Sequence, residues 1–173
     1  MTPTPSIALR PTTRDDLDTL FRIQADPAGN ALAGTKPRTR DAYFAVWDTI
    51  LTDPAVIPRS ILADGLLVGS INQFRMENAN AVGYWIDRAW WGRGVASRAL
   101  ALFLAEVPTR PLHATVALDN AASRRILEKH GFALTHTYEG QETDRYTART
   151  VAAYVLRPDE PRASVSGSCK PMA

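Results

Sequence analysis

A glycine-containing stretch in the middle of the chain has the composition of an anion-binding loop. The sequence GYWID over residues 83–87 predicts a strand that leads into WGRGVAS over residues 91–97. A glycine loop at a helix N-terminus offers free backbone N–H groups, a favourable helix dipole and close access for a phosphate. Arg93 and Arg98 could add charge-assisted hydrogen bonds to phosphate oxygens. The pattern indicates a phosphate site, with an ordinary tight turn as the alternative.

The kind of phosphate ligand is not fixed by this loop. The loop is no Walker A motif, because no Gly-Lys-Ser/Thr follows it. Gly92-x-Gly94-x-x-Ser97 is one residue away from the dinucleotide fingerprint, and Asp119 stands near the place of a ribose-binding acid. A nicotinamide-dinucleotide binder is therefore an alternative, although it would need a Rossmann unit that begins in the middle of the chain.

A second motif distinguishes between these ligands. Residues 119–132, DNAASRRILEKHGF, resemble motif B of the GNAT superfamily of acyl-CoA-dependent N-acetyltransferases: Asn-x-x-Ser/Ala, a helix, a basic residue and Gly-Phe. Motif A of that superfamily, Gln/Arg-x-x-Gly-x-Gly/Ala after a strand, aligns with Trp91 to Ala96. The two motifs cover residues 82–132 in the right order, and the likeness spans about residues 7–156. The chain looks most similar to the Rim-type subgroup, which contains the ribosomal-protein N-terminal acetyltransferases.

The resemblance implies a set of site residues and a reaction. The CoA pyrophosphate would lie in a cradle formed by Gly92, Arg93, Gly94, Val95, Ala96 and Ser97. The backbone of Trp85, Ile86 and Asp87 would pair with the pantetheine amides, and Asn120 would reach the pantetheine arm. Ser123 would lie near the thioester sulfur and act as the catalytic donor to the leaving thiolate. The implied reaction is direct attack of a primary amine on acetyl-CoA in a ternary complex, with a homodimer as an oligomeric state found in such relatives.

Three positions depart from the family pattern. Trp91 replaces the Gln or Arg that opens motif A, which removes one side-chain polar contact. Leu127 stands where many members have the tyrosine that protonates the leaving thiolate, so Ser123 is the remaining donor. Ala81 stands where relatives often have a glutamate that serves as the general base. These absences also motivate a second alternative, a non-catalytic CoA-binding module for sensing or interaction.

The missing base limits the acceptor amine. Deprotonating a lysine-like amine at pH 7 costs about 4.6 kcal/mol, whereas an α-amino group costs only about 1 kcal/mol. The sequence therefore favours an amine of low pKa, such as a peptide N-terminus, an amino acid or an amino sugar. Other bases could come from loop residues, for which the candidates are Glu77, His136, Glu142 and Asp144.

The acceptor side is expected in the first third of the chain. Residues 39–51 predict a helix with a buried apolar stripe, and residues 27–37, with two glycines and an asparagine, predict a loop. These two segments would form the acceptor walls. Asn30, Tyr43 and Trp47 are the candidate acceptor contacts, and burial in the core is the alternative for the two aromatic residues.

The elements that must position these residues alternate along the chain. Strands are expected at residues 7–10, 57–63, 66–76, 81–87, 112–118, 132–138 and 151–156, with the turn Asp64-Gly65 joining the second and third. A helix capped by Thr13, the helix at 39–51, and helices over about 94–106 and 120–130 complete the pattern. The expected fold is α+β (an α/β mixed sheet): a predominantly antiparallel central sheet, about four flanking helices and a βαβα cofactor unit.

Composition excludes several other classes of protein. The chain has 173 residues, 45% of them hydrophobic and 22% charged, and a net charge of +2, too balanced for a dedicated nucleic-acid binder. Its single cysteine, Cys169, excludes an internal disulfide framework, and its three histidines lack the spacing of metal ligands. The expected organisation is one domain over residues 1–157 and a disordered tail over 158–173, in a soluble, cytoplasmic protein without a membrane anchor.

Overall fold

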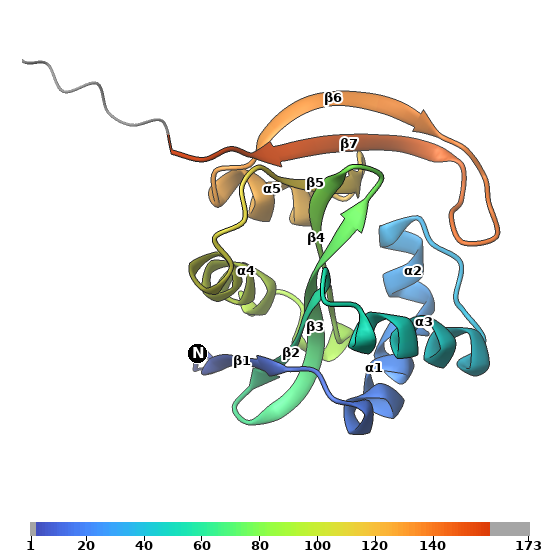
Figure 1. Cartoon of the computed structure of the whole chain (residues 1–173), viewed down its shortest axis with the longest axis vertical. Coiled ribbons are helices and arrows are strands. Elements are labelled where there is room, and N and C mark those ends of the chain that lie inside the picture. The colour runs from blue at the N-terminus through green and yellow to red at the C-terminus, as the bar shows by residue number, and fades with distance from the viewer. Residues whose placement is uncertain (1–2, 160–173) are drawn as a thin grey trace, which may run out of the picture.

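One mixed sheet organises the chain, whose computed structural model describes residues 3–159. Within them, seven strands lie in the order β1-β2-β3-β4-β5-β7-β6 (Figure 1). The strands are β1 Ile7–Pro11, β2 Ile57–Ala63, β3 Leu66–Met76, β4 Ala79–Ile86, β5 Leu112–Ala117, β6 Ala133–Gly140 and β7 Arg149–Leu156. Every neighbouring pair is antiparallel except β4 and β5. The expected antiparallel-dominated sheet is confirmed.

Helices cover both faces of the sheet, with α1, α2 and α3 on the opposite side from α4 (Figure 1). The α-helices are α1 Leu17–Gln24, α2 Pro27–Ala33, α3 Arg40–Thr52, α4 Val95–Glu106 and α5 Ala121–Lys129, and two 3₁₀ turns are η1 Arg14–Asp16 and η2 Arg88–Trp90. On one side, α4 buries Val95, Ala99, Leu100 and Phe103 in a core that also contains Leu127 of α5. On the other side, α1 and α3 form a separate core around Leu17, Tyr43 and Trp47. Helices α1, α3 and α4 thus each bury a stripe at helical spacing.

The prediction of a loop over residues 27–37 is wrong for the first part of that segment, because residues 27–33 form α2. Pro27 is at the first helical position and the Asp26 carboxylate accepts hydrogen bonds from the Ala28 and Gly29 N–H groups, at 3.4 and 3.3 Å. A proline and an acidic cap are strong start signals that outweigh the glycine content. Gly29 is buried against Trp85, where a Cβ would lie 2.9 Å from the indole ring. This helix accounts for five α-helices where about four were expected.

The remaining expected elements appear with small shifts at their ends. Strands β2 and β3 have the expected bounds, and Asp64 and Gly65 take the positive φ angles of 49° and 81° that a tight hairpin turn needs. Thr13 caps the 3₁₀ turn η1, from which α1 continues. The expected tail over 158–173 lies outside the described residues from position 160 onward. None of the helices in residues 3–159 is both long and apolar enough to cross a membrane.

The parallel pair β4–β5 is the feature that creates the site. Among the described residues, its register contains a single pair, Ala81 opposite His113, near the start of both strands. Beyond this point β5 pairs with β7 and β4 pairs with β3. The end of β4 therefore has one backbone edge that no neighbouring strand covers.

Candidate active site

A cavity of about 460 Å³ lies at the carboxyl end of β4. Its walls come from four places: α2, the residues Tyr84, Trp85 and Ile86 of β4, the loop and first turn of α4, and one face of α5 with the cap residue Asn120. Most of the expected cofactor residues line it, namely Trp85, Ile86, Gly92, Gly94, Val95, Ala96, Ser97, Asn120 and Ser123. The structure thus brings together residues that are up to 38 positions apart in the sequence.

The N-terminus of α4 presents unused hydrogen-bond donors to this cavity. Its cap residue is Gly94, with φ 73°, and no side chain caps the helix. The first N–H groups of a helix have no partner inside the helix, so those of Val95, Ala96 and Ser97 are available to an anion. The Arg98 guanidinium donates to the carbonyls of Arg93 and Gly94, at 2.9 and 3.3 Å, and holds the loop. These residues fit a bound phosphate, and Arg98 supports the loop from behind.

Two positively charged side chains line the cavity. Arg125 and Lys129, one turn apart on α5, line it, and none of its lining residues is acidic. Arg93 does not line it, because its guanidinium stacks over the Trp90 ring at 4.9 Å. Sequence reasoning missed Arg125 and Lys129. Their signal was the spacing 122, 125, 126 and 129, which places four residues on one helix face.

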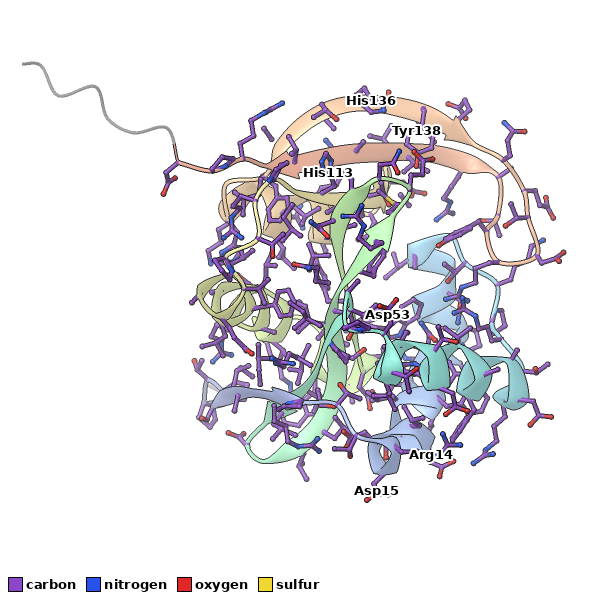
Figure 2. The ribbon with its side chains drawn as sticks, viewed as in Figure 1. Arg14, Asp15, Asp53, His113, His136 and Tyr138 are labelled. Carbon is purple, nitrogen blue, oxygen red and sulfur yellow. The ribbon has the colours of Figure 1, made fainter. Side chains whose placement is uncertain are left out.

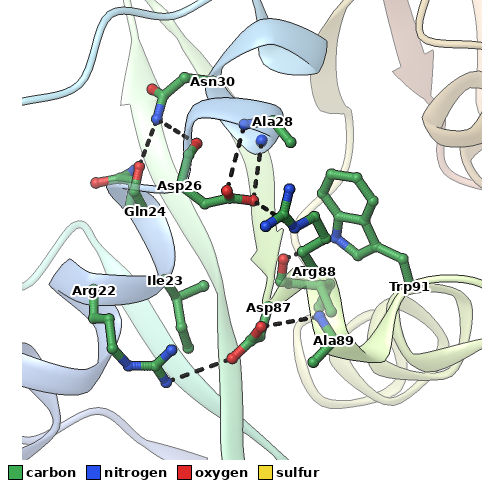
Figure 3. Close-up of polar contacts among 12 residues, drawn as sticks. Arg22, Ile23, Gln24, Asp26, Ala28, Asn30, Asp87, Arg88, Ala89 and Trp91 are labelled. Atoms are coloured by element: carbon green, nitrogen blue, oxygen red, sulfur yellow. Dashed lines mark hydrogen bonds and ion pairs between the residues drawn. The ribbon is translucent and has the colours of Figure 1, made fainter.

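Trp91 and Asp87 tie the loop to the rest of the fold (Figure 3). The Trp91 indole N–H donates to the Ile86 carbonyl at 3.0 Å, so the residue that departs from the family pattern gains a polar contact inside the chain. The Asp87 N–H donates to the Val68 carbonyl at 2.8 Å, and its carboxylate caps η2 at Ala89 and lies 3.4 Å from Arg22. Asp87 is thus a structural residue outside the cavity wall, whereas Trp85 and Ile86 belong to that wall.

Ser123 contacts a tyrosine that the sequence analysis did not select. The Ser123 hydroxyl and the Tyr84 hydroxyl are 2.7 Å apart, and both residues line the cavity. Burial raises the pKa of the Tyr84 phenol, more than its hydrogen bond with Ser123 lowers it. Tyr84 is therefore neutral at physiological pH and can donate a hydrogen bond. Asn120 caps α5 by accepting from the Ser123 N–H at 3.2 Å, and Leu127 is buried in the core.

A second cavity of about 260 Å³ shares two lining residues, Tyr84 and Trp85, with the first. Tyr43 and Trp47, two of the three candidate acceptor contacts, line it while being 3% and 5% exposed. Asn30 does not line it. Its amide N–H groups donate to the Gln24 and Asp26 carbonyls at 2.7 and 3.0 Å, and its oxygen accepts from Thr35 (Figure 3). Asn30 links the residues before and after α2, and both polar atoms of its side chain already bond within the chain, so it does not serve as a contact for the acceptor substrate.

The candidate general bases lie away from both cavities. His136 is exposed on the edge strand β6, with its ring centroid 5.8 Å from that of Tyr138 (Figure 2). The Glu142 carboxylate accepts from Lys36 at 2.8 Å, which lowers its pKa. Glu77 and Asp144 are exposed, and none of the four lines either cavity. Within residues 3–159, no group of His, Cys, Asp and Glu side chains could hold a metal ion.

Comparison with known families identifies this arrangement. The family model described as Acetyltransferase (GNAT) domain matches residues 6–133. The chain belongs to the GNAT acetyltransferase family. It is accordingly an acyltransferase that uses acetyl-CoA, and the resemblance seen in the two sequence motifs is confirmed. No match was found among curated proteins.

Solved structures share the fold at low sequence identity. RimJ of Mycobacterium smegmatis, in complex with CoA-disulfide, superposes with a TM-score of 0.72 at 22% identity, covering 90% of this chain and 83% of its own. An acetyltransferase of Salmonella typhimurium, which modifies the N-terminal serine of ribosomal protein L7/L12, gives 0.73 at 18% identity, covering 89% and 96%. Spermidine N-acetyltransferase of Vibrio cholerae, in complex with CoA and spermine, gives 0.73 at 15% identity, covering 87% and 95%. Rim-type proteins are thus among those of the same fold.

The nicotinamide-dinucleotide alternative does not agree with these findings. A dinucleotide-binding unit is a parallel sheet with its glycine loop between parallel strands. Here the sheet contains one parallel pair, β4–β5, among six neighbouring pairs in the described residues. The Gly92 loop thus lies outside a dinucleotide-binding unit of that kind.

Proposed function

We propose that this acetyltransferase acts on a primary amine of low pKa, by direct attack in a ternary complex. The observation that carries the proposal is that the two cavities share Tyr84 and Trp85 as lining residues. One cavity has the unused donors and cations that suit CoA, and the other has aromatic walls and polar groups that suit an amine. None of the residues lining either cavity is a carboxylate. The acceptor must therefore lose its proton to water, which favours a peptide α-amine, an amino acid or an amino sugar.

The cofactor residues have separate parts in this proposal. The N–H groups of Val95, Ala96 and Ser97 would hold the pyrophosphate, and Arg125 and Lys129 would offset its charge. The uncovered edge of β4 would pair with the pantetheine arm near Ile86, whose carbonyl already accepts from Trp91. Bound acetyl-CoA supplies the activated acetyl group as a thioester. The protein would contribute by holding the amine and the thioester close together in the orientation that the attack requires.

Ser123 and Tyr84 would manage the proton at the leaving group. A serine hydroxyl donates one hydrogen bond and can accept two, so Ser123 can receive the Tyr84 O–H and still donate its own proton. As the Ser123 oxygen gives that proton to the departing thiolate, it would take the Tyr84 proton across the 2.7 Å contact. The proton that the amine loses to water would return to Tyr84 through solvent. This pair would replace the tyrosine that many relatives have at the position of Leu127. Positioned acids of this kind contribute roughly 100- to 10,000-fold to a rate.

Thiol release measured with a panel of amines tests the proposal. We expect release with a peptide α-amine to exceed release with a lysine-like amine at pH 7. Ser123→Ala should lower kcat by about 100-fold or more, and Tyr84→Phe should lower it less, while the Kd of acetyl-CoA stays near that of the wild type. Tyr138→Phe, on the exposed edge strand β6, is the matched control and should change neither quantity. Binding of acetyl-CoA without thiol release from any amine would instead support the non-catalytic module.

The cellular setting belongs to the same proposal. Acetyl-CoA use and the net charge of +2 favour a cytoplasmic enzyme with a peptide or small-molecule partner and without nucleic acid. A homodimer is the expected oligomeric state, and sedimentation equilibrium of the purified protein tests it.

A further inference from the structure

The acceptor-side cavity contains two arginines and no acidic residue. Arg38 precedes α3 and Arg145 belongs to the loop between β6 and β7, and both line the cavity of about 260 Å³ together with Asn72 of β3. None of its lining residues is Asp or Glu. Figure 1 shows the β6–β7 loop descending beside the segment that joins α2 to α3. The cavity is therefore positively charged, although it is lined by segments that are far apart in the sequence.

A network of backbone contacts holds these two segments together. The Lys36 N–H donates to the Arg145 carbonyl at 2.7 Å, and the Thr147 N–H donates to the Gly34 carbonyl at 3.0 Å. The Arg145 guanidinium in turn donates to the Lys36 carbonyl. Two adjacent loops with this many cross-links form a fixed wall. Arg145 is thus held in place by contacts with Lys36, which belongs to the same segment as Arg38.

Neither arginine has a carboxylate partner among residues 3–159. No ion pair involves Arg38 or Arg145, and the nearby Glu142 is bound to Lys36. Burial and the positive charge of Arg38 both lower the pKa of Arg145, which means that the two cations repel each other in a half-buried place. Guanidinium groups without counter-charge are a binding site for carboxylates and other planar anions.

Asn72 adds an unused acceptor to the same cavity. Its side-chain oxygen is inaccessible to solvent and has no hydrogen-bond partner among the described residues. Asn72 pairs across the sheet with Gly83 of β4, one residue before Tyr84. A buried carbonyl oxygen without a donor costs about 1–3 kcal/mol. A bound molecule could satisfy this oxygen only after the Asn72 side chain rotates, so the two arginines alone carry the argument for a charged ligand.

We propose that the acceptor is a small amine that carries a carboxylate or a related anionic group, with the anion at Arg38 and Arg145. This inference rests on the proposed function and adds the substrate class. A volume of about 260 Å³ is below the roughly 300–1,000 Å³ of sites for drug-sized ligands, which agrees with an amino acid or one acidic residue at a peptide N-terminus. Polyamines are disfavoured, because their ammonium groups would meet two like charges.

An acceptor panel with matched charges tests the inference. kcat/KM is measured by thiol release for glutamate, the diamide of glutamate (which has no carboxylate), an acidic dipeptide, its amidated neutral counterpart and spermidine. We expect the anionic member of each pair to exceed the neutral one by at least tenfold and spermidine to be the poorest. A preference for glutamate over the acidic dipeptide assigns a free amino acid, and the reverse assigns a peptide N-terminus. Equal values for charged and neutral members would overturn the proposal.

Variants of the two arginines assign the effect to this cavity. Arg38→Gln should raise KM for the anionic acceptors by at least tenfold, with little change for the neutral ones, and Arg38→Glu should reverse the preference in favour of spermidine. Arg145→Lys keeps the charge while removing the planar fork, and should fall between wild type and Arg38→Gln. Arg75→Gln is the matched control, because Arg75 is exposed on β3 and, within residues 3–159, its side chain bonds only to Asn80. Unchanged selectivity in Arg38→Gln would refute the assignment.

A direct titration separates this inference from the proposed function. If no amine gives thiol release, the proposed activity fails, and calorimetry of glutamate with the CoA-bound protein then decides the inference by itself. Glutamate binding that Arg38→Gln weakens and Arg75→Gln does not would support the anion site. No glutamate binding to the wild type would overturn it.

Discussion

Replacing Gly94 by alanine should weaken acetyl-CoA binding far more than it weakens the fold. Gly94 takes φ 73°, a left-handed conformation that costs about 1–2 kcal/mol for a residue with a Cβ. The added Cβ would meet only the Arg98 side chain, at 3.8 Å, which is ordinary contact. We therefore expect the free energy of unfolding to fall by about 1–2 kcal/mol and the fold to persist.

The effect on binding is larger because the same residue begins α4. A Cβ at Gly94 would lie at the N-terminus of α4. The change in backbone conformation would turn the N–H groups of Val95 and Ala96 away from the bound phosphate. Each hydrogen bond to a charged group is worth about 1.5–3 kcal/mol, so the loss of one raises Kd by roughly 10- to 100-fold. Gly92→Ala should act in the same direction, because Gly92 has φ 72° and borders the same cavity.

The matched control for backbone strain is Gly65→Ala. Gly65 has φ 81° and open space around its Cβ position, at the turn between β2 and β3. It should lose as much stability as Gly94→Ala in urea denaturation and keep the wild-type Kd in a calorimetric titration with acetyl-CoA. An unchanged Kd in Gly94→Ala, with the same loss of stability, would refute the phosphate cradle.

Three further predictions concern the buried carboxylate of Asp16, the tryptophan Trp91 that departs from the family pattern, and the absence of a general base. Arg10 holds both Asp16 oxygens at 2.7 Å and lowers the pKa of that carboxyl to about 2; a shift of nearly two pKa units corresponds to about 2 kcal/mol of stability. This stability is fully present above a pH of about 4 and is lost as the pH falls through about 2. Urea denaturation between pH 6 and pH 2 should show this loss in the wild type and little of it in Asp16→Asn. Trp91→Phe removes the 3.0 Å bond to the Ile86 carbonyl and should lower the free energy of unfolding by about 1 kcal/mol; no change would mean that water replaces the indole. The pH profile of kcat/KM should rise through the pKa of the amine itself, near 8 for a peptide α-amine and above 10 for a lysine-like amine; one common pKa for both amines would reveal a base in the protein.

The grouping of most candidate cofactor residues around one cavity could be predicted because its signals are local. A strand, a glycine loop and a helix start follow one another over residues 83–97, and a second helix start follows at Asn120. Each of these is a short-range pattern with a physical cause, namely positive φ, free N–H groups or an Asn cap. The hairpin β2–β3 was predictable for the same reason. The helix α2 was missed because its glycines outweighed the Asp26-Pro27 start signal in the interpretation.

The pair Tyr84–Ser123 required the sheet topology. These residues are 39 positions apart, and they meet because β4 and β5 part after Ala81 and His113 and leave space that α5 enters. Alternation along β4 tells that Tyr84 and Trp85 point to different faces, but not which helix each face meets. A partly buried tyrosine in a strand is interpreted as a core residue until its hydrogen-bond partner is known. The residue therefore carries no chemical signal in the sequence alone.

The acceptor cavity depends on contacts of still longer range, and its charge explains how an enzyme without a base can work. Arg38 and Arg145 are 107 positions apart and meet through the cross-links between their loops. One carboxylate on the acceptor would neutralise one of the two guanidinium charges, so a net positive charge would remain in the cavity. A nearby cation disfavours an ammonium and lowers the pKa of a bound amine. The same two arginines would then select an anionic acceptor and help its amine to become neutral before it attacks.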